Sequence, residues 1–152
     1  MITQDEQHAT TLALYKIFKE EVYRRRDQMM RWTAIGAGSL VMLLLIALLV
    51  PSVRLLTVPA RLLLASGTLL LALTFAVMIW QQHDRHRQAK QQLITLEHAL
   101  GLFEDHHRPD HHPVYPAHWQ TDWAHDRSLV QYLAILTVLT AITLFAIILP
   151  AQ

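Results

Sequence analysis

The chain has 152 residues, of which 53% are hydrophobic, and its formal net charge at pH 7 is only +1. The length allows one domain, and so small a net charge argues against a nucleic-acid partner, which would call for a basic surface. The absence of cysteine excludes disulfides, thiol nucleophiles and cysteine-ligated metal centres.

Three stretches carry no charged side chain and approach or exceed the ~20 residues that a helix needs to cross a bilayer. They read AIGAGSLVMLLLIALLV at 34–50, LLLASGTLLLALTFAVMIW at 62–80 and LVQYLAILTVLTAITLFAIIL at 129–149. With their flanks they predict transmembrane helices over 33–51, 61–80 and 128–150. The short proline-flanked link at 52–60 predicts an extracytoplasmic hairpin loop. The sequence therefore predicts an all-α membrane protein with three transmembrane helices.

The basic residues predict the orientation of these helices. Six Lys and Arg residues precede the first stretch, five lie between the second and third, and the hairpin region contains only Arg54 and Arg61. Because cytoplasmic segments carry the excess of Lys and Arg, we expect a multi-pass protein of the cytoplasmic (inner) membrane. Its N-terminus would be cytoplasmic and its C-terminus extracytoplasmic.

The two predicted cytoplasmic segments next to the spans have the pattern of helices. Residues 1–32 predict an amphipathic helix, and residues 81–103 predict a second one, because apolar residues recur at three- and four-residue spacing. No proline or glycine interrupts the first before Gly36 or the second before Gly101, so each is expected to continue its transmembrane helix. The apolar stripes have two interpretations, an oligomer interface or packing of the two extensions against each other. They consist of Leu12, Tyr15, Phe18, Val22, Leu93, Leu96, Leu100 and Phe103.

The first extension also carries a run of three arginines. Such a run near the membrane face favours contact with anionic lipid headgroups, worth ~1 kcal/mol per basic residue. The predicted headgroup contacts are Arg24, Arg25 and Arg26.

A histidine- and proline-rich cytoplasmic linker, EDHHRPDHHPVYPAHWQTDWAHDR, occupies 104–127 and holds six of the ten histidines. Imidazole and carboxylate groups are ligands for divalent transition metals, and His83 and His86 add a pair on the preceding helix. Two other interpretations stay open, pH sensing and a solvated loop whose histidines cap helices. The predicted metal ligands are His106, His107, Asp110, His111 and His112.

The linker also contains three aromatic residues, which we expect to lie against the helices or the membrane interface; the other interpretation is a binding pocket for a lipid or a small ligand. They are Tyr115, Trp119 and Trp123.

No Asp, Glu, Lys, Arg or His lies within the three stretches, which argues against ion-coupled transport. Thr137 and Thr140 could line a pore in an oligomer, although such threonines more often bond back to their own helix. Gly36, Gly38 and Gly67 would permit close approach between helices. No recognised catalytic spacing is present, so we expect no catalytic site and no enzyme activity.

Three short segments resemble parts of a known group of proteins. The segments Tyr23–Asp27, Arg31–Gly36 and Leu96–Leu102 look like parts of small bacterial inner-membrane proteins of the RipA-like and SLATT types. The third apolar stretch goes beyond the two-span SLATT plan. The resemblance implies a homo-oligomer of the cytoplasmic membrane, for SLATT a pore-forming effector, and it carries over no catalytic residue.

Taken together, the sequence predicts a homo-oligomeric inner-membrane scaffold or pore-like assembly that contacts membrane lipids. One alternative is an accessory subunit of a larger membrane complex. Another is a metal- or pH-responsive membrane protein that uses the linker.

Overall fold

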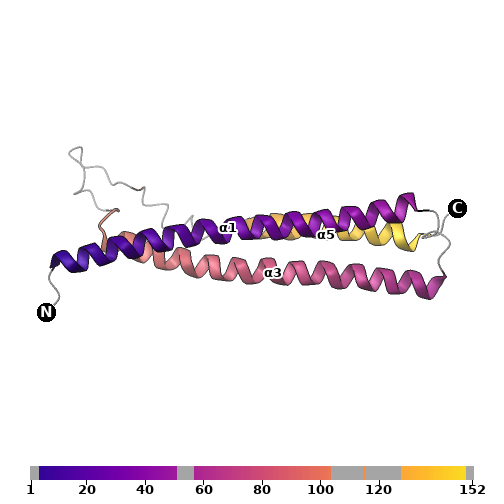
Figure 1. Ribbon diagram of the computed structural model, residues 1–152, viewed down its shortest axis with the longest axis horizontal. Coiled ribbons are helices and arrows are strands. Elements are labelled where there is room, and N and C mark those ends of the chain that lie inside the picture. The colour runs from indigo at the N-terminus through magenta and orange to yellow at the C-terminus, as the bar shows by residue number, and fades with distance from the viewer. Residues whose placement is uncertain (1–3, 51–56, 104–114, 116–127, 150–152) are drawn as a thin grey trace. The chain divides into compact units, whose positions relative to one another are not determined.

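A computed structural model describes residues 4–50, 57–103, 115 and 128–149. It has the helices α1 (Gln4–Leu49), α3 (Val58–Ala99) and α5 (Ser128–Ile148), drawn in Figure 1. Each contains a window apolar and long enough to cross a membrane. Over the described residues, the predicted all-α fold with three helices long and apolar enough to cross a membrane is therefore confirmed.

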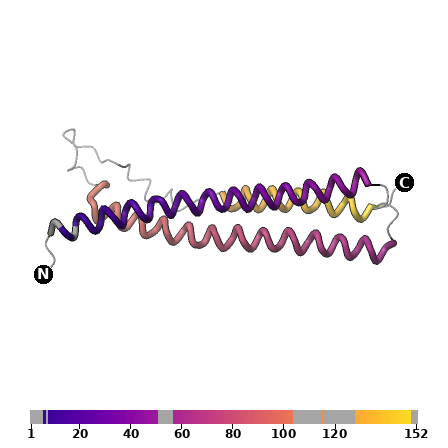
Figure 2. Tube along the Cα trace, viewed as in Figure 1, coloured from indigo at the N-terminus to yellow at the C-terminus, as the bar shows by residue number. Residues whose placement is uncertain are grey.

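Helices α1 and α3 are much longer than their apolar stretches, with 46 and 42 residues. Figure 2 shows α1 as one unbroken helix, as expected for a segment without proline. Gly36 and Gly38 do not interrupt it. Helix α3 begins at Val58, earlier than residue 61, because Pro59 fits the first helical turn, where its missing N–H is not needed.

Helix α3 ends at Ala99, before the predicted boundary at 103, and Gly101 explains the difference. Gly101 has a φ of 68°, a left-handed conformation that glycine adopts without a Cβ penalty. The amide of Leu102 donates to the Glu97 carbonyl at 3.1 Å, and the amide of Gly101 donates to the His98 carbonyl at 2.9 Å. These two bonds form a Schellman cap, which satisfies carbonyls at the end of the helix.

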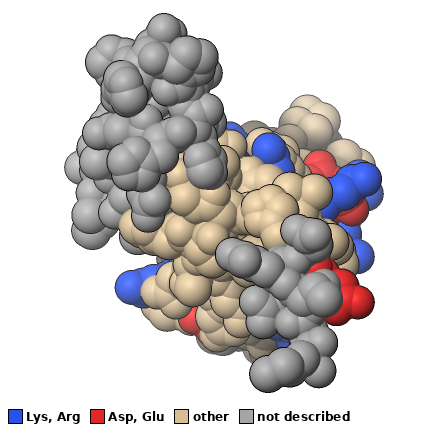
Figure 3. Space-filling model, turned by 90° about the vertical axis from the view of Figure 1, so that its left-hand side faces the viewer, with Lys and Arg blue, Asp and Glu red and all other residues tan. Residues whose placement is uncertain are grey.

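The described residues fall into two compact units. The polar unit comprises residues 4–27, 82–103 and 115, and the apolar unit comprises 28–50, 57–81 and 128–149. In the polar unit α1 and α3 run antiparallel, and Val22, Ala89 and Leu93 form its core with Tyr15 and Phe18 packed against them. Basic and acidic side chains lie interspersed on its surface (Figure 3).

The apolar unit is a three-helix bundle in which α1 and α5 run in one direction and α3 in the other (Figure 1). Leu40, Ala72, Ile79 and Leu136 form one buried cluster. A second cluster consists of Ala47, Ala65 and Ile147. Each cluster contains residues from all three helices, so side-chain packing holds the three helices of the apolar unit together.

One series of buried residues, in α3 and just beyond its end, recurs at intervals of seven. This is the repeat of helices that pack as left-handed coiled coils, because it keeps one stripe facing the partner helix. On α1, Val22, Met29 and Gly36 follow the same interval. The first series consists of Ala65, Ala72, Ile79, His86, Leu93 and Leu100, while Thr68, Ala89 and Glu97 are buried on α3 outside it.

Candidate functional site

A cluster of polar and aromatic side chains lies where α3 of the polar unit ends. The hydroxyls of Tyr15 on α1 and Tyr115 are 3.2 Å apart, and either can donate. The amide of Tyr115 donates to the Leu102 carbonyl at 3.2 Å. The ring of Phe103 lies 6.0 Å from that of Tyr115, within the range of favourable aromatic pairs. Tyr115 therefore lies against the helices, as the sequence predicted for it.

The electrostatics of this cluster are dominated by burial. Glu97 is only 7% exposed, and burial raises the pKa of its carboxyl although Lys19 and His98 act to lower it. Burial also raises the pKa of Tyr15, and so do its hydrogen bond with Tyr115 and the nearby charge of Glu97. The ammonium of Lys19 lies 5.5 Å from the centre of the Tyr15 ring, a cation–π contact. The Tyr15 phenol thus stays protonated at neutral pH and serves as a hydrogen-bonding group, not as a nucleophile.

The predicted apolar stripes pack largely within the chain. Val22, Leu93 and Leu100 are buried, and Tyr15 and Phe18 pack against the apolar core of the polar unit. Leu96 and Phe103 are half-buried. These contacts agree with the interpretation that the two extensions pack against each other. The other interpretation, an oligomer interface, stays a prediction.

The exposed apolar residues of the polar unit are mostly ones that the pattern did not single out. Leu12 belongs to the predicted stripe but is 57% exposed. Leu14, Ile17 and Tyr23 are also exposed. Nothing in the sequence distinguished Leu14, Ile17 and Tyr23, because scattered apolar residues on a polar surface are common.

The three arginines differ in their surroundings. Arg25 donates to Glu21 Oε1 at 2.6 Å and, across the helix pair, to Gln82 Oε1 at 3.0 Å. Arg24 forms an ion pair of 2.7 Å with Glu21 but keeps 66% of its side chain exposed, and Arg26 is exposed. Arg25 thus serves intramolecular pairing, and headgroup contact by the three arginines stays a prediction.

The predicted metal ligands His106, His107, Asp110, His111 and His112 lie outside the described residues, as do Trp119 and Trp123. On α3, His86 is buried at a core position and His83 is half-buried. Within the described part of the chain no group of three histidine, cysteine or acidic residues could hold a metal ion. The metal prediction thus depends on the linker.

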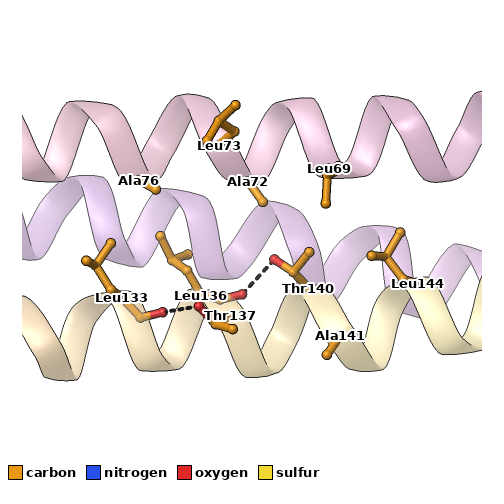
Figure 4. Close-up of a pocket in the computed structure, with 10 residues that line it drawn as sticks. All are labelled: Leu69, Ala72, Leu73, Ala76, Leu133, Leu136, Thr137, Thr140, Ala141 and Leu144. Carbon is orange, nitrogen blue, oxygen red and sulfur yellow. Dashed lines mark hydrogen bonds between the residues drawn. The ribbon is translucent and has the colours of Figure 1, made fainter.

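The apolar unit contains a groove of about 460 Å³ between α3 and α5. In the close-up of Figure 4, α1 lies behind it, Leu69 and Ala72 extend from α3 toward α5, and Leu136, Thr140 and Leu144 extend toward α3. The lining consists of Leu69, Ala72, Leu73, Ala76, Leu133, Leu136, Thr137, Thr140, Ala141 and Leu144.

Both threonines predicted to line a pore lie in this groove. Thr137 donates to the Leu133 carbonyl at 2.8 Å, and Thr140 donates to the Leu136 carbonyl at 2.6 Å. Their hydroxyl protons are therefore used within α5, which is the more common arrangement for threonine in a membrane helix.

Two glycines of α1 differ sharply in what surrounds them. A Cβ at Gly36 would lie 3.0 Å from the Phe75 ring and 3.1 Å from Leu136, so the absence of a side chain permits internal packing. A Cβ at Gly38 would meet nothing within 4 Å, and Gly38 is exposed. Packing within the chain therefore explains why a residue without a side chain is needed at position 36, but it does not explain the glycine at position 38.

Comparisons with protein families, curated proteins and solved structures found no match for this chain. The resemblance to RipA-like and SLATT proteins therefore stays an expectation based on the three short segments that carry it.

Proposed function

We propose that this chain is a homo-oligomeric scaffold of the cytoplasmic membrane, in which the apolar unit associates with further copies inside the bilayer. The observation that carries the proposal is the open surface at Gly38. Ala34 lies four residues earlier on α1 and is also exposed. Small residues at this spacing let two membrane helices approach closely, and such contacts drive association where lipid removes the hydrophobic effect.

A pore-like assembly receives less support than a scaffold. The exposed Thr137 uses its hydroxyl proton within α5, and so do Ser39, Ser66 and Thr74 within their own helices. The described exterior of the apolar unit is otherwise dominated by leucine, isoleucine and valine. Such a surface suits contact with lipid and with other apolar helices.

The excess of Lys and Arg in 1–32 and 81–127 supports a cytoplasmic location for the polar unit and the linker. In this arrangement the scaffold holds the α1–α3 pair and the linker at the cytoplasmic side. A reporter fused to the C-terminus should then be active only outside the cytoplasm, and activity inside it would contradict the orientation.

The association is tested with Gly38→Leu, using native mass spectrometry and dilution in detergent. We expect the wild-type chain to form a discrete multimer and Gly38→Leu to weaken association at least ~10-fold, which corresponds to ~1.4 kcal/mol. Gly67→Leu is the matched control, because Gly67 also faces open space but has leucine four residues away on either side. Equal helicity by circular dichroism would show that the variants fold.

A wild-type chain that stays monomeric at all concentrations would contradict the proposal. It would favour an accessory subunit of a larger membrane complex. Equal weakening by Gly38→Leu and Gly67→Leu would contradict the role of the Ala34–Gly38 surface.

A further inference from the structure

We propose that the groove between α3 and α5 binds one acyl chain of a membrane phospholipid. This inference goes beyond the scaffold function and uses other residues than the Ala34–Gly38 surface. It follows from the chemistry of the lining, the length of the groove and the residues at its rim.

The lining selects an apolar occupant. Eight of the ten lining residues are leucine or alanine. The remaining two, Thr137 and Thr140, donate their hydroxyl protons to carbonyls of α5. A polar headgroup would find no free donor among these side chains and would lose its hydration on entering.

The volume and length of the groove suit a hydrocarbon chain. Its volume of about 460 Å³ lies within the ~300–1,000 Å³ of small-molecule sites. Along α5 the lining runs from Leu133 to Leu144, ~16 Å at the helical rise of ~1.5 Å per residue. An apolar groove of this length suits a single extended methylene chain that lies along α5.

The residues at the rim point to the same occupant. Leu69 and Leu73 of α3 are 57% and 61% exposed, and they stand beside the smaller Ala72 and Ala76. Bulky leucines hold a neighbouring helix away from the floor, since close helix contact requires small residues on the outer ridge. A flexible chain can lie between them and gain dispersion contacts with the alanines and threonines that a helix would not reach.

A membrane would supply phospholipid at high concentration, because each helix that forms the groove is long and apolar enough to cross a bilayer. The lipid tail enters from a medium as apolar as the groove. Its binding therefore depends on the fit of the chain and not on the hydrophobic effect. Filling the floor of the groove should accordingly abolish binding even though it makes the surface more apolar.

The test counts phospholipids that stay bound to the full chain in detergent, by native mass spectrometry and by quantifying extracted lipid phosphate. Ala76→Leu fills the floor from α3, where Figure 4 shows Ala76 facing α5. Ala134→Leu adds the same atoms to an exposed position of α5 that does not line the groove. Ala141→Leu obstructs the groove from its exposed rim and serves as a second variant should Ala76→Leu fail to fold.

We expect one phospholipid per wild-type chain, loss of the lipid-bound peak in the folded Ala76→Leu or Ala141→Leu protein, and full retention in Ala134→Leu. Equal retention in all variants would overturn the proposal, because it would mean non-specific lipid around the helices. Absence of lipid from the wild type would overturn it too. A shift of oligomeric state in Ala76→Leu without change in bound lipid would show that the groove receives a second copy instead.

Discussion

The hydroxyl of Tyr15 lies 3.2 Å from the hydroxyl of Tyr115, a residue one hundred positions later in the chain. This contact joins the linker to the α1–α3 pair of the polar unit, close to the cap that ends α3. It is supported by the Tyr115 amide, which bonds to the Leu102 carbonyl, and by the ring of Phe103. The linker therefore has a defined attachment point among the described residues.

Removal of the Tyr15 hydroxyl should loosen this attachment. Tyr15→Phe keeps the ring against the core of the polar unit but removes one of the two paired hydroxyls. The loss of this hydrogen bond should lower the stability of the contact by ~1 kcal/mol. Hydrogen exchange at the Tyr115 amide should become ~5-fold faster, in line with that loss. Tyr23→Phe changes an exposed tyrosine of the same helix and should have no effect. Unchanged exchange in Tyr15→Phe would mean that the hydroxyl contact does not hold the linker.

Burial of Glu97 predicts a pH dependence of the polar unit. Because the pKa of Glu97 in the folded chain is raised above its usual 4.5, its contribution to stability is complete below that value. The contribution is lost as the pH rises through the folded pKa. Glu97→Gln, which is neutral at every pH, should therefore raise the melting temperature above pH 4.5 and flatten the decline of the melting temperature as the pH rises from that value.

Thermal unfolding in detergent, followed by circular dichroism, measures this effect. Glu20→Gln is the control, because Glu20 is exposed on α1 and its replacement should leave the pH profile unchanged. A wild-type polar unit that becomes more stable as the pH rises from 5 to 7, with Glu97→Gln abolishing that rise, would contradict the predicted sign.

The close approach at Gly36 predicts a specific coupling with Phe75. Gly36→Ala places a Cβ 3.0 Å from the Phe75 ring, and overpacking of this kind should cost ~1–3 kcal/mol. Phe75→Ala in the same chain should recover part of this loss, because alanine lacks the Cγ atom that would lie 3.0 Å from the new Cβ. Unfolding free energies of the two single variants and the double variant give the coupling directly. Strictly additive effects would show that Leu136, and not Phe75, limits the space.

Arg25 should matter more to stability than its neighbours. It bridges the helix pair from Glu21 to Gln82 with most of its side chain covered, so Arg25→Ala should lower the unfolding free energy by ~1 kcal/mol. Arg25→Lys should not restore it, because an ammonium cannot reproduce the fork of donors. Arg26→Ala should stay within ~0.5 kcal/mol of the wild type. Equal losses for Arg25→Ala and Arg26→Ala would point to net charge and not to the bridge.

The helices were predictable from the sequence because their signals are local. Apolar stretches free of charge, and long segments without proline, indicate α1, α3 and α5 whatever their neighbours are. The inward face of the stripe at Tyr15, Phe18 and Val22 follows from helical spacing, whereas Leu12 lies at the edge of that face and stays exposed. The hydrogen bonds that Thr137 and Thr140 donate to carbonyls of their own helix also follow the common pattern.

The candidate sites were less predictable, because they depend on which distant residues meet. Burial of Glu97 and the contact between Tyr15 and Tyr115 arise from the pairing of α1 with the end of α3. The groove depends on how α3 and α5 pack side by side, and the contrast between Gly36 and Gly38 depends on where Phe75 falls. Spacing within one segment carries no information on these relationships.

The buried positions His86, Leu93 and Leu100 of the polar unit, spaced by seven, constrain how the length of this helix pair can change. One inserted residue would turn the following part of a helix by ~100° and move the next core residue to the surface. Seven residues inserted into both α1 and α3 would keep every buried position in place and lengthen the pair by ~10 Å. Length variants of this protein that still fold should therefore differ by whole multiples of seven residues, added to the two helices together.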